Sequence, residues 1–275
     1  MTAGLEEVIA GLHRLPSLPL AVQEVIASFE DPEPDAVSLA RGIAKDQGLS
    51  ARVLRVANSS FYGLPRKVGS MQDAVVVLGL DSIRSLVMSA GMVQSFPPLR
   101  GSVFDRNGYW RRSFRVAGYT KALADCLRQG QPMSFTAGMF HDIGQLVLDT
   151  CMPEQFSGIL SLQKASGQDL IEIERSALGF DHAMIGAEVA RQWNFPTEIE
   201  QAICGWRTPE REPAGSVTGM VYMAVLLESG LRGDGLMAQL PVSLIERLQI
   251  SWGRIEASLP EPADLDAAAN LLLAT

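Results

Sequence analysis

The stretch AGMFHDIGQLVL, residues 137–148, combines a helical apolar pattern with the adjacent pair His141 and Asp142. Residues 137, 140, 141, 144 and 148 share one helical face, so His141 is predicted to point inward with the apolar side chains. Imidazole suits transition metals and carboxylate suits most hard cations, so the pair can contribute ligands to one divalent ion. Two ligands alone do not make a metal site.

Helical periodicity continues on both sides of this stretch, and no alternating pattern predicts a β-hairpin. The sequence therefore predicts an all-α fold. Toward the N-terminus, Asp35 and Ser70 are placed as helix N-caps, Ser50 as a helix start, and the β-branched run 74–78 as helix in preference to strand. Further helices are predicted over 109–128, 135–148, 154–166, 171–177, 182–193, 197–204, 217–228 and 244–248.

A boundary is predicted where Pro97 and Pro98 are followed by Gly101 and Gly108, because adjacent prolines end a helix and favour extended backbone. We expect two helical lobes that meet near residues 97–108. The first is an N-terminal lobe over residues 1–100. The second covers residues 101–275 and includes a C-terminal helical extension.

The composition is that of a packed protein: 275 residues, 47% of them apolar, with a mean hydropathy of +0.12. The longest uncharged stretches have 15 residues, fewer than the roughly 20 that a membrane span needs, so no membrane insertion is expected. Residues 1–7 lack the basic and apolar regions of a secretory signal, which predicts a cytoplasmic protein. The net charge of −8 disfavours nucleic acid as a partner.

Basic residues are concentrated between Arg41 and Arg84, where seven Lys or Arg stand against three Asp. This asymmetry has two interpretations, a docking face for another molecule or an ordinary solvated helix surface. The residues of the candidate docking face are Arg52, Arg55, Arg66 and Lys67.

Several motifs occur in an order that resembles the HDOD domain, a bacterial signalling relative of HD-type metal-dependent phosphohydrolases. They are LPSLP at 15–19, DQGL at 46–49, NSSFYG at 58–63, GMFHDIG at 138–144 and HAMIGA at 182–187. The resemblance extends over about 190 residues. It implies two helical lobes and a role as an output or adaptor module in signal transduction.

The resemblance also implies that the metal site is degenerate. The first histidine ligand of catalytic HD proteins matches Arg112, the final aspartate matches Val225, and a later histidine pair matches Trp206 and Arg207. The residues of this degenerate cleft are Arg112, His141, Asp142, His182, Trp206, Arg207 and Val225. We therefore expect no metal, no cofactor and no catalytic residue.

Arg112 shares a helical stripe with Val116, Tyr119 and Leu123, so it is predicted to face the position of the lost metal. A guanidinium is always protonated and cannot bind a cation. The sequence predicts a structural salt bridge between Arg112 and Asp142.

Three functions follow as hypotheses. The first is a non-catalytic adaptor that binds signalling proteins, such as a receiver domain, a kinase or a cyclic-di-GMP pathway protein. The second is a residual metal-dependent phosphohydrolase that uses His141, Asp142 and His182. The third is a nucleotide or anion sensor in which Arg112, with Arg111 or Arg115, holds a phosphate. The sequence leaves the oligomeric state open.

Overall fold

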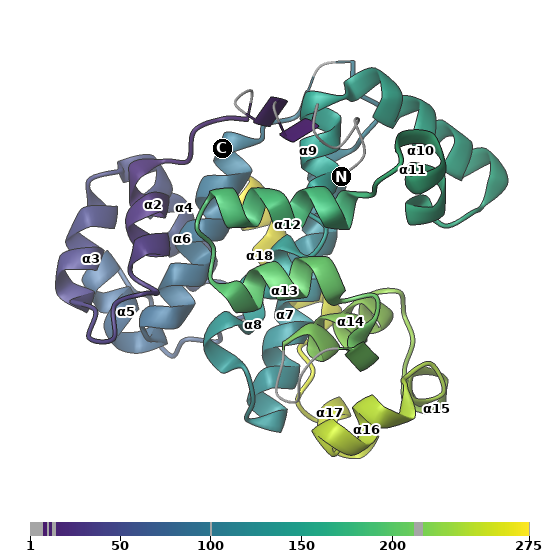
Figure 1. Ribbon diagram of the computed structural model, residues 1–275. Coiled ribbons are helices and arrows are strands. Elements are labelled where there is room, and N and C mark those ends of the chain that lie inside the picture. Colours follow the sequence, from purple (N-terminus) through teal and green to yellow (C-terminus); the bar gives the residue numbers. More distant parts are fainter. Residues whose placement is uncertain (1–7, 10, 13–14, 100, 212–216, 275) are drawn as a thin grey trace.

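A computed structural model describes residues 8–9, 11–12, 15–99, 101–211 and 217–274 (Figure 1). Within these ranges every regular element is a helix and there is no strand, so the all-α prediction is confirmed. Residues 1–7, on which the expected lack of a secretory signal rests, lie outside the described ranges. No helix in the described part combines the length and apolar character needed to cross a bilayer.

Residues 20–95 form a group of five helices, which lies at the left of Figure 1. The bounds are α2 (Leu20–Ala27), α3 (Ala36–Ala44), α4 (Gln47–Ala57), α5 (Met71–Leu78) and α6 (Leu80–Ser95). Asp35 accepts hydrogen bonds from the first-turn amides of α3, and Ser70 does so for α5, as predicted. The predicted start at Ser50 is wrong because Asp46 caps α4 one turn earlier, and the Ser50 hydroxyl instead donates to the Ile43 carbonyl.

The remaining helices are arranged around α7, which is long and central (Figure 1). Helices α8, α14 and α18 pack directly against it. The bounds are α7 (Arg106–Leu127), α8 (Gln131–Phe140), α9 (Gly144–Cys151), α10 (Pro153–Ser166), α11 (Leu170–Leu178), α12 (His182–Gln192), α13 (Thr197–Gly205), η2 (Pro209–Arg211), α14 (Thr218–Glu228), α15 (Gly233–Met237), α16 (Val242–Leu248), α17 (Trp252–Glu256) and α18 (Pro262–Leu273).

The predicted helix over 135–148 is two helices. Helix α8 ends at Phe140, a turn holds His141 to Ile143, and α9 begins at Gly144. Gly144 lies so close to the backbone carbonyl of His182 that a Cβ at this position would overlap it. The break therefore places α9 against α12 and positions the His141–Asp142 pair between them.

The helical pattern is interrupted between α6 and α7, in the region where the lobe boundary is predicted. Arg106 holds this connection: its guanidinium donates to the Pro97 carbonyl, to Thr150 Oγ1, and to Asp149 Oδ2 at 2.7 Å. Both members of the Arg106–Asp149 pair are buried. The division into lobes of 1–100 and 101–275 stays a prediction, since one hydrophobic cluster contains residues from α2 through α18.

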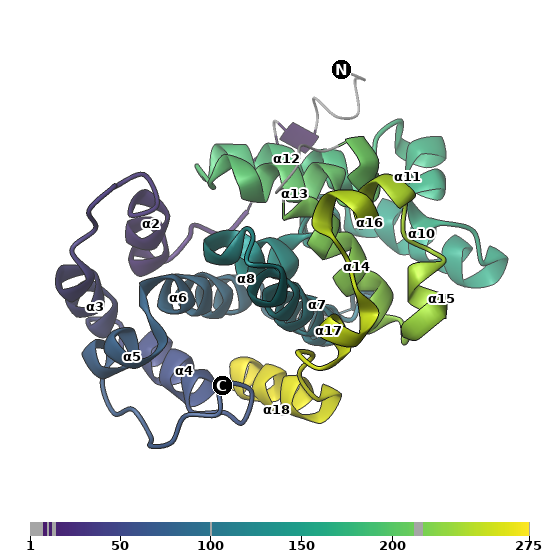
Figure 2. The same cartoon turned by 90° about the horizontal axis from the view of Figure 1, so that it is seen from below.

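The C-terminal helix α18 lies beside α4, α6 and α7, so it packs on both the group α2–α6 and the central helix α7 (Figure 2). Its apolar face is buried and consists of Leu265, Ala268, Ala269 and Leu272. Arg52 donates to the Leu272 carbonyl and Arg55 to the Ala274 carbonyl, each at 2.9 Å. Two of the four arginines and lysines of the predicted docking face therefore bind the end of α18.

Candidate functional site

Asp142 is buried at the centre of a set of polar side chains drawn from four segments of the chain. Arg112 Nη1 and Gln145 Nε2 each donate to Asp142 Oδ2 at 3.1 Å. The indole Nε1 of Trp206 donates to Oδ1 at 3.2 Å. The Nε2 atoms of His141 and His182 lie 3.4 Å from Oδ2 and Oδ1, respectively. We call these six residues the Asp142 network.

The predicted salt bridge between Arg112 and Asp142 is confirmed by this geometry. The two partners differ in burial, because the Asp142 side chain is 1% exposed and that of Arg112 is 37% exposed. Arg112 Nε also donates to Glu228 Oε2 at 3.3 Å. The pair thus connects the buried carboxylate to a second acidic residue on α14.

His182 lies between Asp142 and Glu174, and all three side chains are buried. Its Nδ1 is 2.7 Å from Glu174 Oε2, which also accepts a hydrogen bond from the His182 backbone amide. Burial by itself lowers the pKa of His182, but the hydrogen bonds to Asp142 and Glu174 outweigh burial and raise the pKa to about 9. His182 is therefore an imidazolium at neutral pH.

His141 has the opposite protonation state. Burial, with the nearby positive charge of Arg112, lowers the pKa of His141 to about 4 despite the proximity of Asp142. Its Nδ1 lies 2.7 Å from the Gly138 carbonyl, so the neutral ring carries its proton there. Burial acts to raise the pKa of Asp142, but His141, His182 and Arg112 hold it well below its usual range. Asp142 is therefore a carboxylate.

The three arginines proposed for anion binding are all occupied by partners within the chain. Arg115 donates to Glu228 Oε1 at 2.7 Å and to Asp266 Oδ1 at 2.9 Å. Arg111 is exposed and its Nε donates to Asn270 Oδ1 of α18. Only Arg112 belongs to the Asp142 network, so the structure does not bring the three guanidinium groups together around open space.

The two other predicted cleft residues lie at its edges. Arg207 covers the outer face of the Trp206 ring, with its guanidinium carbon 4.5 Å from the ring centroid. Val225 is half-buried on α14, and the acidic side chain that reaches Arg112 from this helix is Glu228, one turn later.

The donor set does not fit a divalent cation. The guanidinium of Arg112 and the indole N–H of Trp206 occupy the two oxygens of Asp142, and both are donors that cannot bind a metal. Both ring nitrogens of His182 face carboxylate oxygens. No group of three or more metal-binding side chains occurs in the described ranges.

Sequence reasoning missed three residues of this site, which are Gln145, Glu174 and Glu228. Gln145 follows Asp142 by three residues, and this spacing alone could have predicted the contact between the two side chains. Glu174 and Glu228 approach from α11 and α14, and nothing local to either residue indicates its partner.

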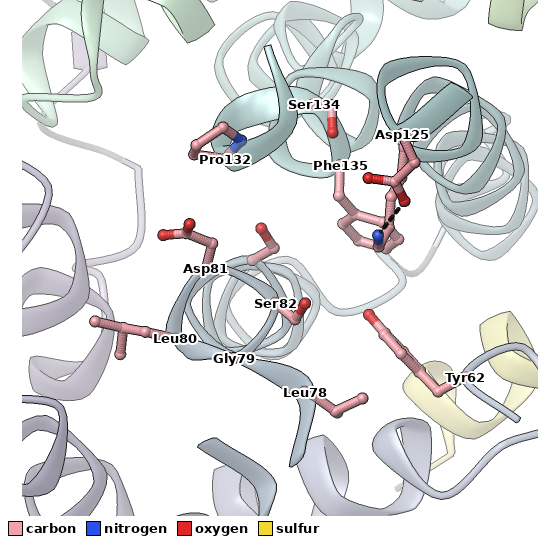
Figure 3. Close-up of a pocket in the computed structure, with 12 residues that line it drawn as sticks. Tyr62, Leu78, Gly79, Leu80, Asp81, Ser82, Asp125, Pro132, Ser134 and Phe135 are labelled. Atoms are coloured by element: carbon pink, nitrogen blue, oxygen red, sulfur yellow. Dashed lines mark hydrogen bonds and ion pairs between the residues drawn. The ribbon is translucent and has the colours of Figure 1, made fainter. Parts of the chain in front are cut away.

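A separate hollow of about 270 Å³ lies where the start of α6 meets the end of α7 and the start of α8 (Figure 3). Tyr62, Asp81, Asp125 and Ser134 are among the residues that line it. Lys121 at its wall is paired with Asp125 at 2.6 Å. None of its lining residues belongs to the Asp142 network.

The HDOD domain family model matches residues 15–207, so this chain belongs to the HDOD family. The resemblance found in the motifs is therefore confirmed. Membership in this family fits a role in signalling.

Solved structures share the fold over most of the chain. A candidate phosphohydrolase from Shewanella amazonensis SB2B is 29% identical, with a TM-score of 0.81 and 99% of each chain covered. An HDOD domain protein of unknown function from Geobacter sulfurreducens is 26% identical, with a TM-score of 0.72 over 93% of this chain and 88% of that one.

An uncharacterized protein from Treponema pallidum (strain Nichols) is 23% identical over 243 residues. The match covers 86% of this chain and 46% of that protein. The chain thus spans about half the length of this curated relative.

Proposed function

We propose that this chain is a non-catalytic signalling module that acts by binding another protein. The observation that carries the proposal is the donor set on Asp142: the guanidinium of Arg112 and the indole of Trp206 take the oxygens that a metal would need. A buried carboxylate satisfied in this way holds helices together, and its lone pairs are not available to bind a metal ion that would act as a Lewis acid.

The test is an activity assay on the full chain. Hydrolysis of bis(p-nitrophenyl) phosphate is measured with added Mn²⁺, Fe²⁺ or Mg²⁺, and elemental analysis is run on the protein as purified. We expect no turnover above the metal-only blank and no stoichiometric transition metal. Metal-dependent turnover that disappears in Asp142→Ala would contradict the proposal and favour the phosphohydrolase.

The protein-binding part of the proposal has its own support. Arg66 and Lys67 stay exposed, and they line a shallow groove with Val76, which is 85% exposed on α5. Asp73 also lines this groove, so the two cations exceed the one carboxylate, and an apolar side chain beside such an excess suits an acidic partner surface. Charge reversal of both basic residues to Glu is expected to abolish cross-linking to the signalling partner, whereas Lys164→Glu on α10 is not. Equal cross-linking in both variants would place the partner elsewhere.

A further inference from the structure

A second polar hollow, of about 420 Å³, lies outside the Asp142 network at the ends of α11, α12 and α13. Its lining includes Arg175, Arg207 and Arg211 but only one carboxylate, that of Asp181. Its wall thus carries an excess of positive charge in a chain whose net charge is −8. The volume lies within the range of small-molecule sites, which is about 300–1,000 Å³.

The single carboxylate is already satisfied by the protein. Asp181 is fully buried, and its Oδ1 accepts from the Met184 amide at the start of α12. Its Oδ2 accepts from Arg175 Nε at 2.7 Å. The Arg175 side chain is 63% exposed, so the edge of its guanidinium that does not face Asp181 is open to a ligand.

The other two arginines have unused donors. The guanidinium of Arg207 lies over the Trp206 ring, its Nη1 donates to Asp169, and no hydrogen bond of its Nη2 is found among the described residues. Arg211 is exposed, and no side-chain hydrogen bond or ion pair of Arg211 is found within the described part of the chain. A planar guanidinium presents a fork of N–H donors that matches phosphate oxygens, and stacking on a ring fixes the orientation of that fork.

The hollow also has an apolar side. Met184 keeps 42% of its surface exposed, and Ile171 lies in the same wall. A methionine side chain adapts readily to a flat ring or an alkyl group. The combination of guanidinium donors with an apolar surface suits a ligand that has both characters.

We infer that this hollow binds a phosphate ester that carries an apolar or aromatic group. Arg207 and Arg211 bind the phosphate, Arg175 adds the edge of its guanidinium, and Met184 contacts the ester group. This site does not depend on the proposed adaptor role. It connects to the Asp142 network through Arg207, because the Trp206 ring beneath Arg207 donates its N–H to Asp142.

The test is calorimetric titration of the full chain with phenyl phosphate, with inorganic phosphate as the second arm and ionic strength matched by NaCl. We expect saturable binding, tighter for phenyl phosphate than for inorganic phosphate. Arg211→Gln removes no contact within the protein. It is expected to weaken the binding of phenyl phosphate at least about tenfold, the loss typical of a charge-assisted hydrogen bond. Met184→Ser is expected to weaken the binding of phenyl phosphate and to leave the affinity for inorganic phosphate unchanged.

The matched control is Arg191→Gln, which removes the same charge from an exposed side chain paired with Glu188 at the other end of α12. It is expected to bind phenyl phosphate as the parent does. No saturable binding up to about 10 mM, or equal losses in Arg191→Gln and Arg211→Gln, would overturn the inference. Phosphodiesterase activity is not part of this readout, so failure here leaves the proposed function standing.

Discussion

Asp142 is contacted by every other member of the Asp142 network, and its two oxygens are shared among side chains with different charges. Arg112 and the imidazolium of His182 offset its charge, while Gln145 and Trp206 complete its hydrogen bonds. Removing a buried charged group strands its partners, which costs more than losing an exposed pair. The energetic role of Asp142 thus exceeds that of Arg112.

Asp142→Ala is expected to lower the free energy of unfolding by about 3–5 kcal/mol, because it leaves the buried imidazolium of His182 facing Glu174 alone. Arg112→Met is expected to cost about 1 kcal/mol, since its side chain is 37% exposed. Urea denaturation measures both values. A double-mutant cycle of the two changes is expected to give a coupling energy above about 0.5 kcal/mol, and additive effects would refute the pairing.

The two buried histidines predict a dependence of stability on pH. The pKa of His182 is raised from 6.5 to about 9, so its contribution is complete below pH 6.5 and is lost as the pH rises toward 9. The pKa of His141 is lowered from 6.5 to about 4, so its contribution is complete above pH 6.5 and is lost as the pH falls toward 4. The free energy of unfolding is therefore expected to be greatest near pH 6.5.

Urea titrations between pH 4 and pH 9 test this expectation, and the chain has only three histidines to resolve by imidazole NMR. His182→Gln is expected to remove most of the decline on the alkaline side. An imidazole of His182 that titrates near pH 6.5 in the folded protein would contradict the assignment.

Part of the site could be read from the sequence, and the reason is local. Arg112 lies on a predictable face of α7, Asp142 belongs to the recognisable His141–Asp142 pair, and the order of the family motifs predicts that the two lie close together. The partners Glu174 and Glu228 could not be predicted, because their contacts depend on where α11 and α14 pack. The contacts of Arg52 and Arg55 could not be predicted for the same reason. The sequence places both on a candidate docking face, and only the packing of α18 brings its last carbonyls to them.

At the scale of the elements, close backbone contact decides where the helices cross. Gly144 at the start of α9 meets the His182 carbonyl of α12, and Gly138 in α8 meets the backbone of Ala117 in α7. Periodicity predicts helices from local pattern, and the ranges predicted for α10, α11, α12 and α13 agree with the structure within one residue at each end. The interruption at 141–143 was missed because it serves the packing of α9 on α12, which no local pattern records.

Gly144→Ala is expected to destabilise the protein by about 1–3 kcal/mol, since the new Cβ must displace backbone and not a flexible side chain. Gly158→Ala, in the middle of α10, has open space around its Cβ and is the matched control. It is expected to stabilise by up to about 1 kcal/mol through helix propensity. Thermal unfolding followed by circular dichroism measures the melting temperature of each variant. Equal shifts in the two variants would contradict the prediction, because they would mean that α9 and α12 move apart without cost.

For the molecule as a whole, the main hydrophobic cluster contains residues from both sides of the predicted boundary, while α10 and α11 contribute to two smaller clusters. Helix α18 takes part in this continuity, because it packs on α4 and α6 as well as on α7. Arg115 adds a polar connection by binding both Glu228 and Asp266. A shared core predicts that the two predicted lobes unfold together.

Leu265→Ala in α18 is expected to lower the free energy of unfolding by about 2–5 kcal/mol, since this side chain is fully buried beside Gly118 and Phe61. Leu162→Ala, at an exposed position on α10, is expected to change it by less than about 0.5 kcal/mol. Tryptophan fluorescence and circular dichroism are expected to report one coincident transition. Two separate transitions would show that the lobes unfold independently.

The donors around Asp142 also restrict the evolutionary routes open to this chain. A change of Arg112 to histidine would place a side chain that can bind a metal at this position. Trp206 would still donate to Asp142 Oδ1, and Glu228 would lose a cationic neighbour. This single change therefore lowers stability without providing a complete set of ligands. Arg112 and Trp206 each donate to a different oxygen of Asp142, so a metal ion gains both oxygens only if positions 112 and 206 change together, and a single mutation at either position does not create a metal site.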